Sequence, residues 1–303
     1  MTDTNDQSTH PQLALPHLTR RRLLTVGGLL AATGLAGGLY TNVLEPRWID
    51  IETVPLRLTN LHESLIGRRI VQISDIHLCQ YMSSERLLDA IETVNQLEPD
   101  WVLITGDFVS KDASYARGLV EPLRMLNAPA FAVYGNHDYW SDAATVAQNL
   151  AETPVQLLRN QALPLTDKLW LAGVDDIWSG SPDLSYTLQE VPHHGVTTLL
   201  MAHEPDFFDN VLQSNAPIDV QFSGHSHGGQ VRLPTLTAGA NGKHSYAPVL
   251  PHLGQRYPIG HRTMTQENGR QVQLYTNRGL GVWPLPVRFN CRPEITLFEL
   301  QRV

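Results

Sequence analysis

The chain has 303 residues, 42% of them hydrophobic, and a formal net charge of -8. This acidic balance argues against nucleic acid as a partner, because binding to phosphate backbones needs a basic surface. The length suffices for one catalytic domain with a full hydrophobic core. The two cysteines, Cys79 and Cys291, lie far apart and belong to no C-x-x-C motif, so they do not indicate a structural zinc site.

The N-terminal segment has the pattern of an export signal. Three arginines, Arg20 to Arg22, precede an apolar, glycine-rich stretch over residues 23–40. Such a charged region before an apolar one is typical of export signals, and paired arginines indicate the twin-arginine route. The stretch is also just long enough to span a bilayer, so a retained anchor is an open alternative. We assign residues 1–50 to this signal or anchor and its linker, and expect a periplasmic or membrane-anchored protein outside the cytoplasm.

Five short apolar runs, each ended by glycine or polar residues, predict buried strands of an α/β protein. They cover residues 69–74, 101–105, 130–134, 197–202 and 220–223. Each run leads directly into residues that can bind a metal. Open α/β sheets place ligands at the carboxyl ends of their strands, so we expect these residues to meet at one rim.

The segments that follow these runs supply the ligands of a two-metal hydrolytic centre. They are Asp75-Ile76-His77, Gly106-Asp107, Gly135-Asn136-His137-Asp138, His203 and Gly224-His225-Ser226-His227. Two ions about 3.5 to 4 Å apart need several ligands each and a carboxylate that touches both. Imidazole suits zinc or iron, whereas carboxylate and amide oxygens suit manganese, so the mixed set predicts two divalent ions of borderline type. One such segment alone would be an ordinary turn, but five in order predict a metal centre.

The ordered set D-x-H, GD, GNHD, H and GHSH resembles the calcineurin-like metallophosphoesterase superfamily over about residues 55–303. The extended segment Gly224 to Gln230 and the late segments Asn277 to Gly281 and Arg292 to Ile295 are similar to a bacterial exported phosphodiesterase branch. That branch includes proteins similar to a UDP-2,3-diacylglucosamine pyrophosphatase. The resemblance implies an α/β fold, a four-layer α/β/β/α sandwich, over residues 51–303. We expect this domain to be a monomer.

The resemblance also implies a role for each site residue. The first metal would be bound by Asp75, His77 and His227, the second by Asn136, His203 and His225, and both by the bridging Asp107. His137 would reach the substrate phosphate or the leaving-group oxygen, and Asp138 would orient His137. The ions, which we take to be manganese, iron or zinc, would turn a bridging water into the attacking hydroxide. A histidine that protonates the leaving oxygen contributes about 10² to 10⁴ in rate.

These roles predict a metal-dependent hydrolase of phosphodiester or pyrophosphate bonds. Its phosphoester substrate would be amphipathic or lipid-linked, such as UDP-2,3-diacylglucosamine in lipid A biosynthesis, and the protein would associate with the membrane. Two alternatives stay open: a phosphomonoesterase, which uses the same metals, and a non-catalytic envelope-binding protein whose metal centre is a relic. The complete ligand set favours the enzyme.

Three other features have ordinary interpretations. Asp175 and Asp176 follow a predicted strand and are expected in a turn, and Cys79 is expected not to bind metal because the rest of the ligand set is not soft. An oxidising compartment would also permit a disulfide between Cys79 and Cys291. The long loop over residues 233–257 either forms an apolar wall for the substrate or packs on its own core.

Overall fold

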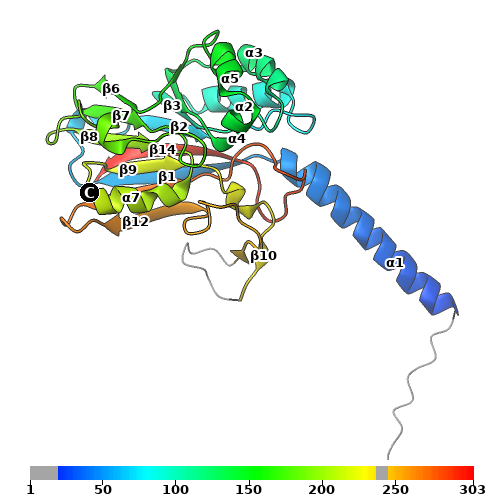
Figure 1. Ribbon diagram of the computed structural model, residues 1–303. Coiled ribbons are helices and arrows are strands. Elements are labelled where there is room, and N and C mark those ends of the chain that lie inside the picture. Colours follow the sequence, from blue (N-terminus) through cyan, green and yellow to red (C-terminus); the bar gives the residue numbers. More distant parts are fainter. Residues whose placement is uncertain (1–19, 237–244) are drawn as a thin grey trace, which may run out of the picture. The chain divides into compact units, whose positions relative to one another are not determined.

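The computed structural model describes residues 20–236 and 245–303 (Figure 1). The parts of the predicted signal and of the predicted long loop that fall on residues 1–19 and 237–244 lie outside these ranges. The chain divides into two units, of which the first ends at Tyr40 and the second covers Thr41–Val303.

The first unit contains helix α1 (Arg20–Leu39), which carries the apolar stretch predicted from the sequence. Within the described residues, the helical stretch Arg20–Arg47 is the one segment long and apolar enough to cross a membrane. Its mean hydropathy reaches 1.5 and none of that window is buried. A helix of this kind near the N-terminus is suited to serve as a signal or as an anchor.

The second unit is built on two mixed sheets of six strands each. The order in the first sheet is β1 (Asp50–Leu58), β14 (Glu294–Arg302), β2 (Arg69–Ile73), β3 (Trp101–Thr105), β4 (Ala130–Val133) and β5 (Val155–Leu157). Strands β2 to β5 are parallel, whereas β14 runs antiparallel to β2. The last strand of the chain therefore lies inside the sheet, between β1 and β2.

The second sheet also has six strands, of which four are parallel. Its order is β12 (Gly260–Thr265), β13 (Gln271–Thr276), β9 (Val220–Ser223), β8 (Thr197–Met201), β7 (Leu169–Gly173) and β6 (Gln161–Thr166). The four central strands are parallel and the two edge strands are antiparallel. A small separate ribbon pairs β10 (Leu233–Pro234) with β11 (Ser245–Tyr246). The five strands predicted from the sequence are confirmed as β2, β3, β4, β8 and β9.

Helices cover the outer face of each sheet. They are α2 (Ser84–Gln96), α3 (Val120–Arg124), α4 (Asn136–Ser141), α5 (Ala143–Leu150), α6 (Leu184–Thr187) and α7 (Phe208–Ser214). Figure 1 shows α2, α3 and α5 gathered on one side of the sheets and α7 on the other. Helix α2 illustrates the cause, because its buried residues Leu87, Ala90, Ile91 and Val94 fall on one stripe at helical spacing.

Strand side chains alternate between two buried layers. In β3, Leu103 points into the core between the sheets, and Ile104 points into the core under α2, α3 and α5. In β8, Leu199 enters the same inter-sheet core, whereas Leu200 packs with Phe208 of α7. Burial on both faces explains the continuous apolar runs in the sequence. The predicted four-layer α/β/β/α arrangement is confirmed.

A buried glutamine ties the two sheets together next to the loops that follow their strands. Gln72 Nε2 in β2 donates to Thr105 Oγ1 of β3 at 2.9 Å and to the carbonyl of Ser223 in β9 at 3.0 Å. Amide donors buried without partners are unfavourable, so this arrangement favours one spacing of the sheets. The loops that follow β2, β3 and β9 therefore begin at fixed positions relative to one another.

Residues 41–50, the last part of the segment assigned to the signal or anchor and its linker, belong to the second unit. Glu45 is fully buried and its Oε1 accepts a hydrogen bond from the backbone of Cys291 at 2.6 Å. The carbonyl of Thr41 accepts a hydrogen bond from the backbone of Arg288 at 2.9 Å. The compact unit consequently begins at Thr41, directly after the first unit.

Candidate metal centre

The predicted ligand residues lie in the loops that follow five strands from both sheets. These are Asp75 and His77 after β2, Asp107 after β3, Asn136 and His137 at the start of α4 after β4, His203 after β8, and His225 and His227 after β9. All of them are buried. The structure therefore brings together residues that are up to about half the chain apart.

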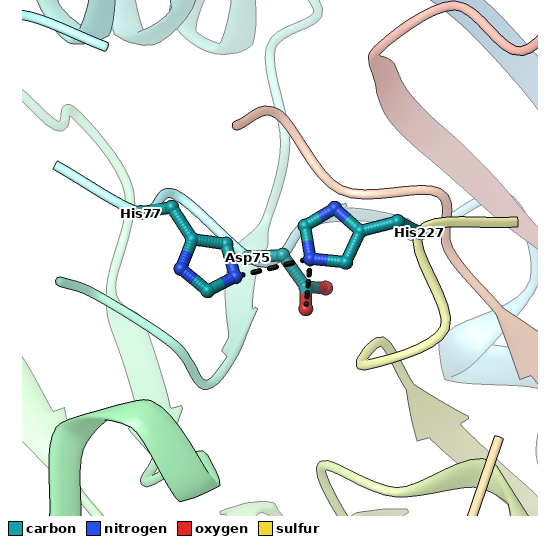
Figure 2. A group of neighbouring side chains, drawn as sticks. All are labelled: Asp75, His77 and His227. Carbon is teal, nitrogen blue, oxygen red and sulfur yellow. Dashed lines mark hydrogen bonds and ion pairs between the residues drawn. The ribbon is translucent and has the colours of Figure 1, made fainter. Parts of the chain in front are cut away.

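The histidines and aspartates form three overlapping groups with the spacing of metal ligands. The groups are Asp75, His77 and His227; His77, Asp107 and His137; and Asp107, His203 and His225, and within each group the ligand atoms lie within 4.8 Å of one another. Figure 2 shows the first group, in which the rings of His77 and His227 converge beside the carboxylate of Asp75. Their Nε2 atoms are 3.0 Å apart.

Asp107 lies between a histidine that follows a strand of the first sheet and one that follows a strand of the second. Its Oδ2 is 3.3 Å from Nε2 of His77 and 3.2 Å from Nε2 of His203. Its Oδ1 accepts a hydrogen bond from the backbone of His137 at 2.9 Å, which holds the carboxylate in this orientation. One oxygen atom thus faces both groups, as a carboxylate shared by two ions requires.

The hydrogen bonds of two histidines leave a nitrogen of each ring facing the other, a position that suits a proton or a cation. Nδ1 of His203 donates to the carbonyl of Thr105 at 2.6 Å, and Nε2 of His225 donates to the carbonyl of His252 at 2.6 Å. The remaining nitrogens, Nε2 of His203 and Nδ1 of His225, face each other at 3.3 Å. Each neutral ring presents a lone pair there, so the contact needs a proton or a metal ion.

Unsatisfied polar atoms also mark the centre. In the described part of the chain, Oδ1 of Asn136 and Nδ1 of both His77 and His227 are buried without a hydrogen-bond partner. A buried carbonyl left unpaired costs about 1–3 kcal/mol. A metal ion would satisfy the oxygen of Asn136, so the donor set fits a site of mixed nitrogen and oxygen ligands.

The backbone at the centre is strained. Five of the seven predicted ligands have a positive φ: Asp75, His77, Asp107, His225 and His227, with values from 47° to 65°. Each such residue costs of order 1–3 kcal/mol and persists where the surroundings hold it. A close contact adds to this constraint, because a Cβ at Gly224 would lie 2.3 Å from Oδ2 of Asp75.

Burial and neighbouring charges shift the pKa values of several groups at the centre. Burial disfavours the ionised carboxylate of Asp107, but His203, His137 and His77 outweigh it and hold the pKa of Asp107 well below its usual range. Burial also disfavours the imidazolium of His203, yet Asp107 raises the pKa of His203 well above its usual value. Burial and the neighbouring His77 lower the pKa of His227. Ionised Asp107 and neutral His227 are thus in the forms that bind divalent ions, whereas His203 would have to release its proton to bind one.

The hydrogen-bond partners of His137 and Asp138 differ from those expected from the sequence. Nδ1 of His137 donates to the carbonyl of Ser110, which leaves Nε2 as its free ring nitrogen. Asp138 does not orient this ring, because its oxygens accept hydrogen bonds from the backbone of Asp107 at 3.1 Å and Phe108 at 2.8 Å. The prediction that Asp138 orients His137 is therefore wrong. Asp138 fixes the loop that carries Asp107.

Asp175, the two cysteines and the long loop have the following places in the structure. Asp175 lies in the turn after β7, where it binds Arg159 and the backbone of Ser181, so it is no ligand. Cys79 and Cys291 are free thiols. In the long loop, Val249 and Leu250 line the cavity at the site, whereas Tyr257 packs in the core.

An apolar cavity of about 560 Å³ opens from the metal centre. Asp107, Asn136 and the histidines form its polar end, and its walls come from Trp140, Trp178, Trp283, Val231, Pro248, Val249, Leu250, Pro251, Pro284, Leu285 and Val287. None of the three tryptophans was expected at the site from the sequence. Trp140 had a usable signal, since it lies three residues after His137 and thus on the same helix face. The other two approach from distant loops without a local pattern.

Comparisons with known proteins agree with this geometry. A family model described as calcineurin-like phosphoesterase matches residues 68–229. The uncharacterised metallophosphoesterase YkuE of Bacillus subtilis is 34% identical over 94% of this chain and 98% of its own length. Phosphodiesterase YaeI of Escherichia coli is 28% identical over 93% of this chain and 99% of its own. The UDP-2,3-diacylglucosamine pyrophosphatase LpxG of Chlamydia muridarum is 30% identical over 90% and 97%.

Asp107→Asn is expected to lower the metal content of the purified protein from about two ions per chain to fewer than one. The amide lacks the negative charge that a shared ligand supplies to two divalent ions. Elemental analysis by mass spectrometry measures this directly. Asp175→Asn is the matched control, since Asp175 is equally buried but outside the ligand groups. Two ions retained in Asp107→Asn would contradict the assignment.

Proposed function

The chain belongs to the calcineurin-like phosphoesterase family, and we propose that it hydrolyses phosphodiester or pyrophosphate bonds of amphipathic, lipid-linked substrates at a dinuclear metal centre. The observation that carries the proposal is a single continuous site. A cluster of metal-ligand side chains forms one end of a cavity whose other walls are apolar. Such a site suits a phosphate group joined to a hydrocarbon portion.

The proposed ligand assignment follows the two sides of Asp107. Asp75, His77 and His227 would hold one ion, Asn136, His203 and His225 the other, and Asp107 both. When bound, manganese, iron or zinc ions polarise phosphoryl oxygens and lower the pKa of water. The side chains supply the rest of the chemistry by positioning the substrate and by moving a proton.

His137 is the candidate for the proton transfer. It lines the cavity, and its Nδ1 is held by Ser110, so Nε2 is the nitrogen available to a leaving-group oxygen. Burial lowers the pKa of His137 to about 4, so the free ring is neutral near pH 7. A bound phosphate anion would favour the imidazolium, because an opposite charge stabilises the charged form. His137 would then protonate the leaving oxygen through Nε2.

Tryptophan side chains complete the walls of the site next to His137. The ring of Trp283 lies 4.5 Å from the ring of His137 and 6.2 Å from that of His77, measured between centroids. Trp140 lies 4.7 Å from His137 on another side. These rings would exclude bulk water around the transferred proton and provide apolar contact to the substrate.

Two observations support the proposed substrate class, namely the apolar walls of the cavity and the substrate for which a relative is named. The relative from Chlamydia muridarum is named for a nucleotide sugar that carries two acyl chains. The apolar walls of the present cavity suit an acyl chain, whereas a small polar ester would leave them uncovered. We infer that the protein acts in the cell envelope, where α1 serves as a twin-arginine signal or as an anchor.

The first test compares three substrates. We expect the manganese-loaded protein to release nitrophenol from bis-nitrophenyl phosphate, to act more slowly on nitrophenyl phosphate, and to cleave a diacylated sugar pyrophosphate with a higher kcat/KM than its deacylated form. Preference for nitrophenyl phosphate would identify a monoesterase. No metal-dependent hydrolysis of any of them would favour an envelope-binding protein.

His137→Ala is expected to keep its metal ions and to lose turnover by about 10² to 10⁴ for a poor leaving group. The loss should shrink for good leaving groups, since these need little protonation. A series of aryl phosphodiesters of increasing leaving-group pKa measures the trend. His193→Ala provides the control, because His193 is exposed in a loop. An equal loss across the series would remove the general-acid role.

The export proposal is tested by replacing Arg20, Arg21 and Arg22 with lysine. The ammonium group lacks the fixed donor geometry of a guanidinium, so recognition by the twin-arginine route should fail. We expect the variant to accumulate in the cytoplasm in cell fractionation. An unchanged yield outside the cytoplasm would indicate a general secretory signal or a plain anchor.

A further inference from the structure

We propose that the mouth of the cavity docks on the surface of a lipid bilayer, so that substrate enters the site from the membrane. The inference rests on the proposed function for its substrate, but the surface itself is defined by the structure. It consists of exposed apolar side chains around the opening, namely Trp140, Trp178, Val249 and Leu285, called the rim below.

The rim exposes large apolar groups beside a buried polar centre. The exposed fractions of Val249 and Leu285 are 75% and 63%, although both also line the cavity. The rings of Trp140 and Trp178 are in contact, with centroids 5.0 Å apart. Exposed apolar side chains that gather in this way mark a binding surface, and here all four also line the cavity of the site.

The scarcity of basic side chains near the rim indicates that the rim would contact the apolar part of the bilayer interface and not the charged headgroups. Among the described residues, no lysine or arginine lines the cavity, and a single lysine, Lys111, lies over the wall residue Trp283, with its Nζ 4.7 Å from the ring centroid. The whole chain has a net charge of -8. Attraction to anionic headgroups needs a cluster of basic residues. Docking through the rim would therefore depend on apolar burial and would not require anionic lipids.

The chain enters the second unit next to the rim. The carbonyl of Thr41, the first residue of that unit, accepts a hydrogen bond from the backbone of Arg288 at 2.9 Å. Arg288 is three residues after Leu285, a separation of at most about 11 Å along an extended chain. An apolar helix retained in the membrane would thus attach the second unit close to the mouth of its cavity.

Residues near this attachment point have the composition of a membrane interface. Leu44 and Trp48 are exposed, and the guanidinium of Arg292 lies 3.7 Å from the ring centroid of Trp48. Tryptophan is enriched at the level of lipid headgroups, and arginine side chains reach toward water from the same depth. The attachment point thus has side chains suited to the headgroup level of a bilayer, as the proposed docking requires.

The experiment places a fluorescent label on the rim of the full-length protein. Leu285→Cys and Ile66→Cys are made in a Cys79→Ser background, labelled with bimane, and reconstituted into phosphatidylcholine liposomes. Ile66 is the matched control, because it is 50% exposed and precedes β2, at the opposite end of that strand from Asp75. Flotation confirms that the protein is on the liposomes.

We expect brominated phosphatidylcholine to quench the label at position 285 several-fold more than the label at position 66, at both low and high salt. Val249→Cys should behave like Leu285→Cys. Equal quenching at positions 285 and 66 would overturn the proposal. Protection of position 285 that increases with protein concentration would assign the rim to a second copy and would also overturn it. The readout needs no substrate, so failure of the proposed hydrolysis is observed separately.

Discussion

The centre of the molecule depends on one buried carboxylate that is shared by imidazoles from two sheets. Asp107 follows β3, and its Oδ2 faces His77 after β2 and His203 after β8. Buried charges of this density are stable only when they are paired or bind metal ions. The left-handed backbone at the ligands and the hydrogen bonds of Asp138 bring the loops close enough for that pairing.

The packing of the layers explains how the loops that form this centre are held in place. The inter-sheet core fixes the distance between the two sets of loops, and Gln72 ties β2 to β9 just below them. The loops at the carboxyl ends of β3 and β9 and the start of α4 together form the polar end of the cavity. His137 then lies between the ligands and the tryptophans, with one nitrogen fixed by Ser110 and the other available to the substrate.

Local patterns predicted the strands and the residues that gather at the centre. Burial on both faces gives continuous apolar runs, and the D-x-H, GNHD and GHSH motifs each lie within a few residues. These patterns did not predict contacts that depend on backbone positions or on distant segments. The role of Asp138 is set by the amides of Asp107 and Phe108, which the sequence does not place. The walls of the cavity combine Trp178 with residues near 250 and 285, which are distant from it in the sequence. The packing of residues 41–50 likewise depends on the hydrogen bond between Glu45 and the distant Cys291.

The central claim is that Asp107 bridges two ions, and anomalous X-ray scattering from manganese-loaded crystals tests it most directly. The account predicts two anomalous peaks about 3.5 to 4 Å apart, one beside Asp75, His77 and His227 and the other beside Asn136, His203 and His225, with Oδ2 of Asp107 between them. A single peak, or two peaks of which only one contacts Asp107, would contradict it.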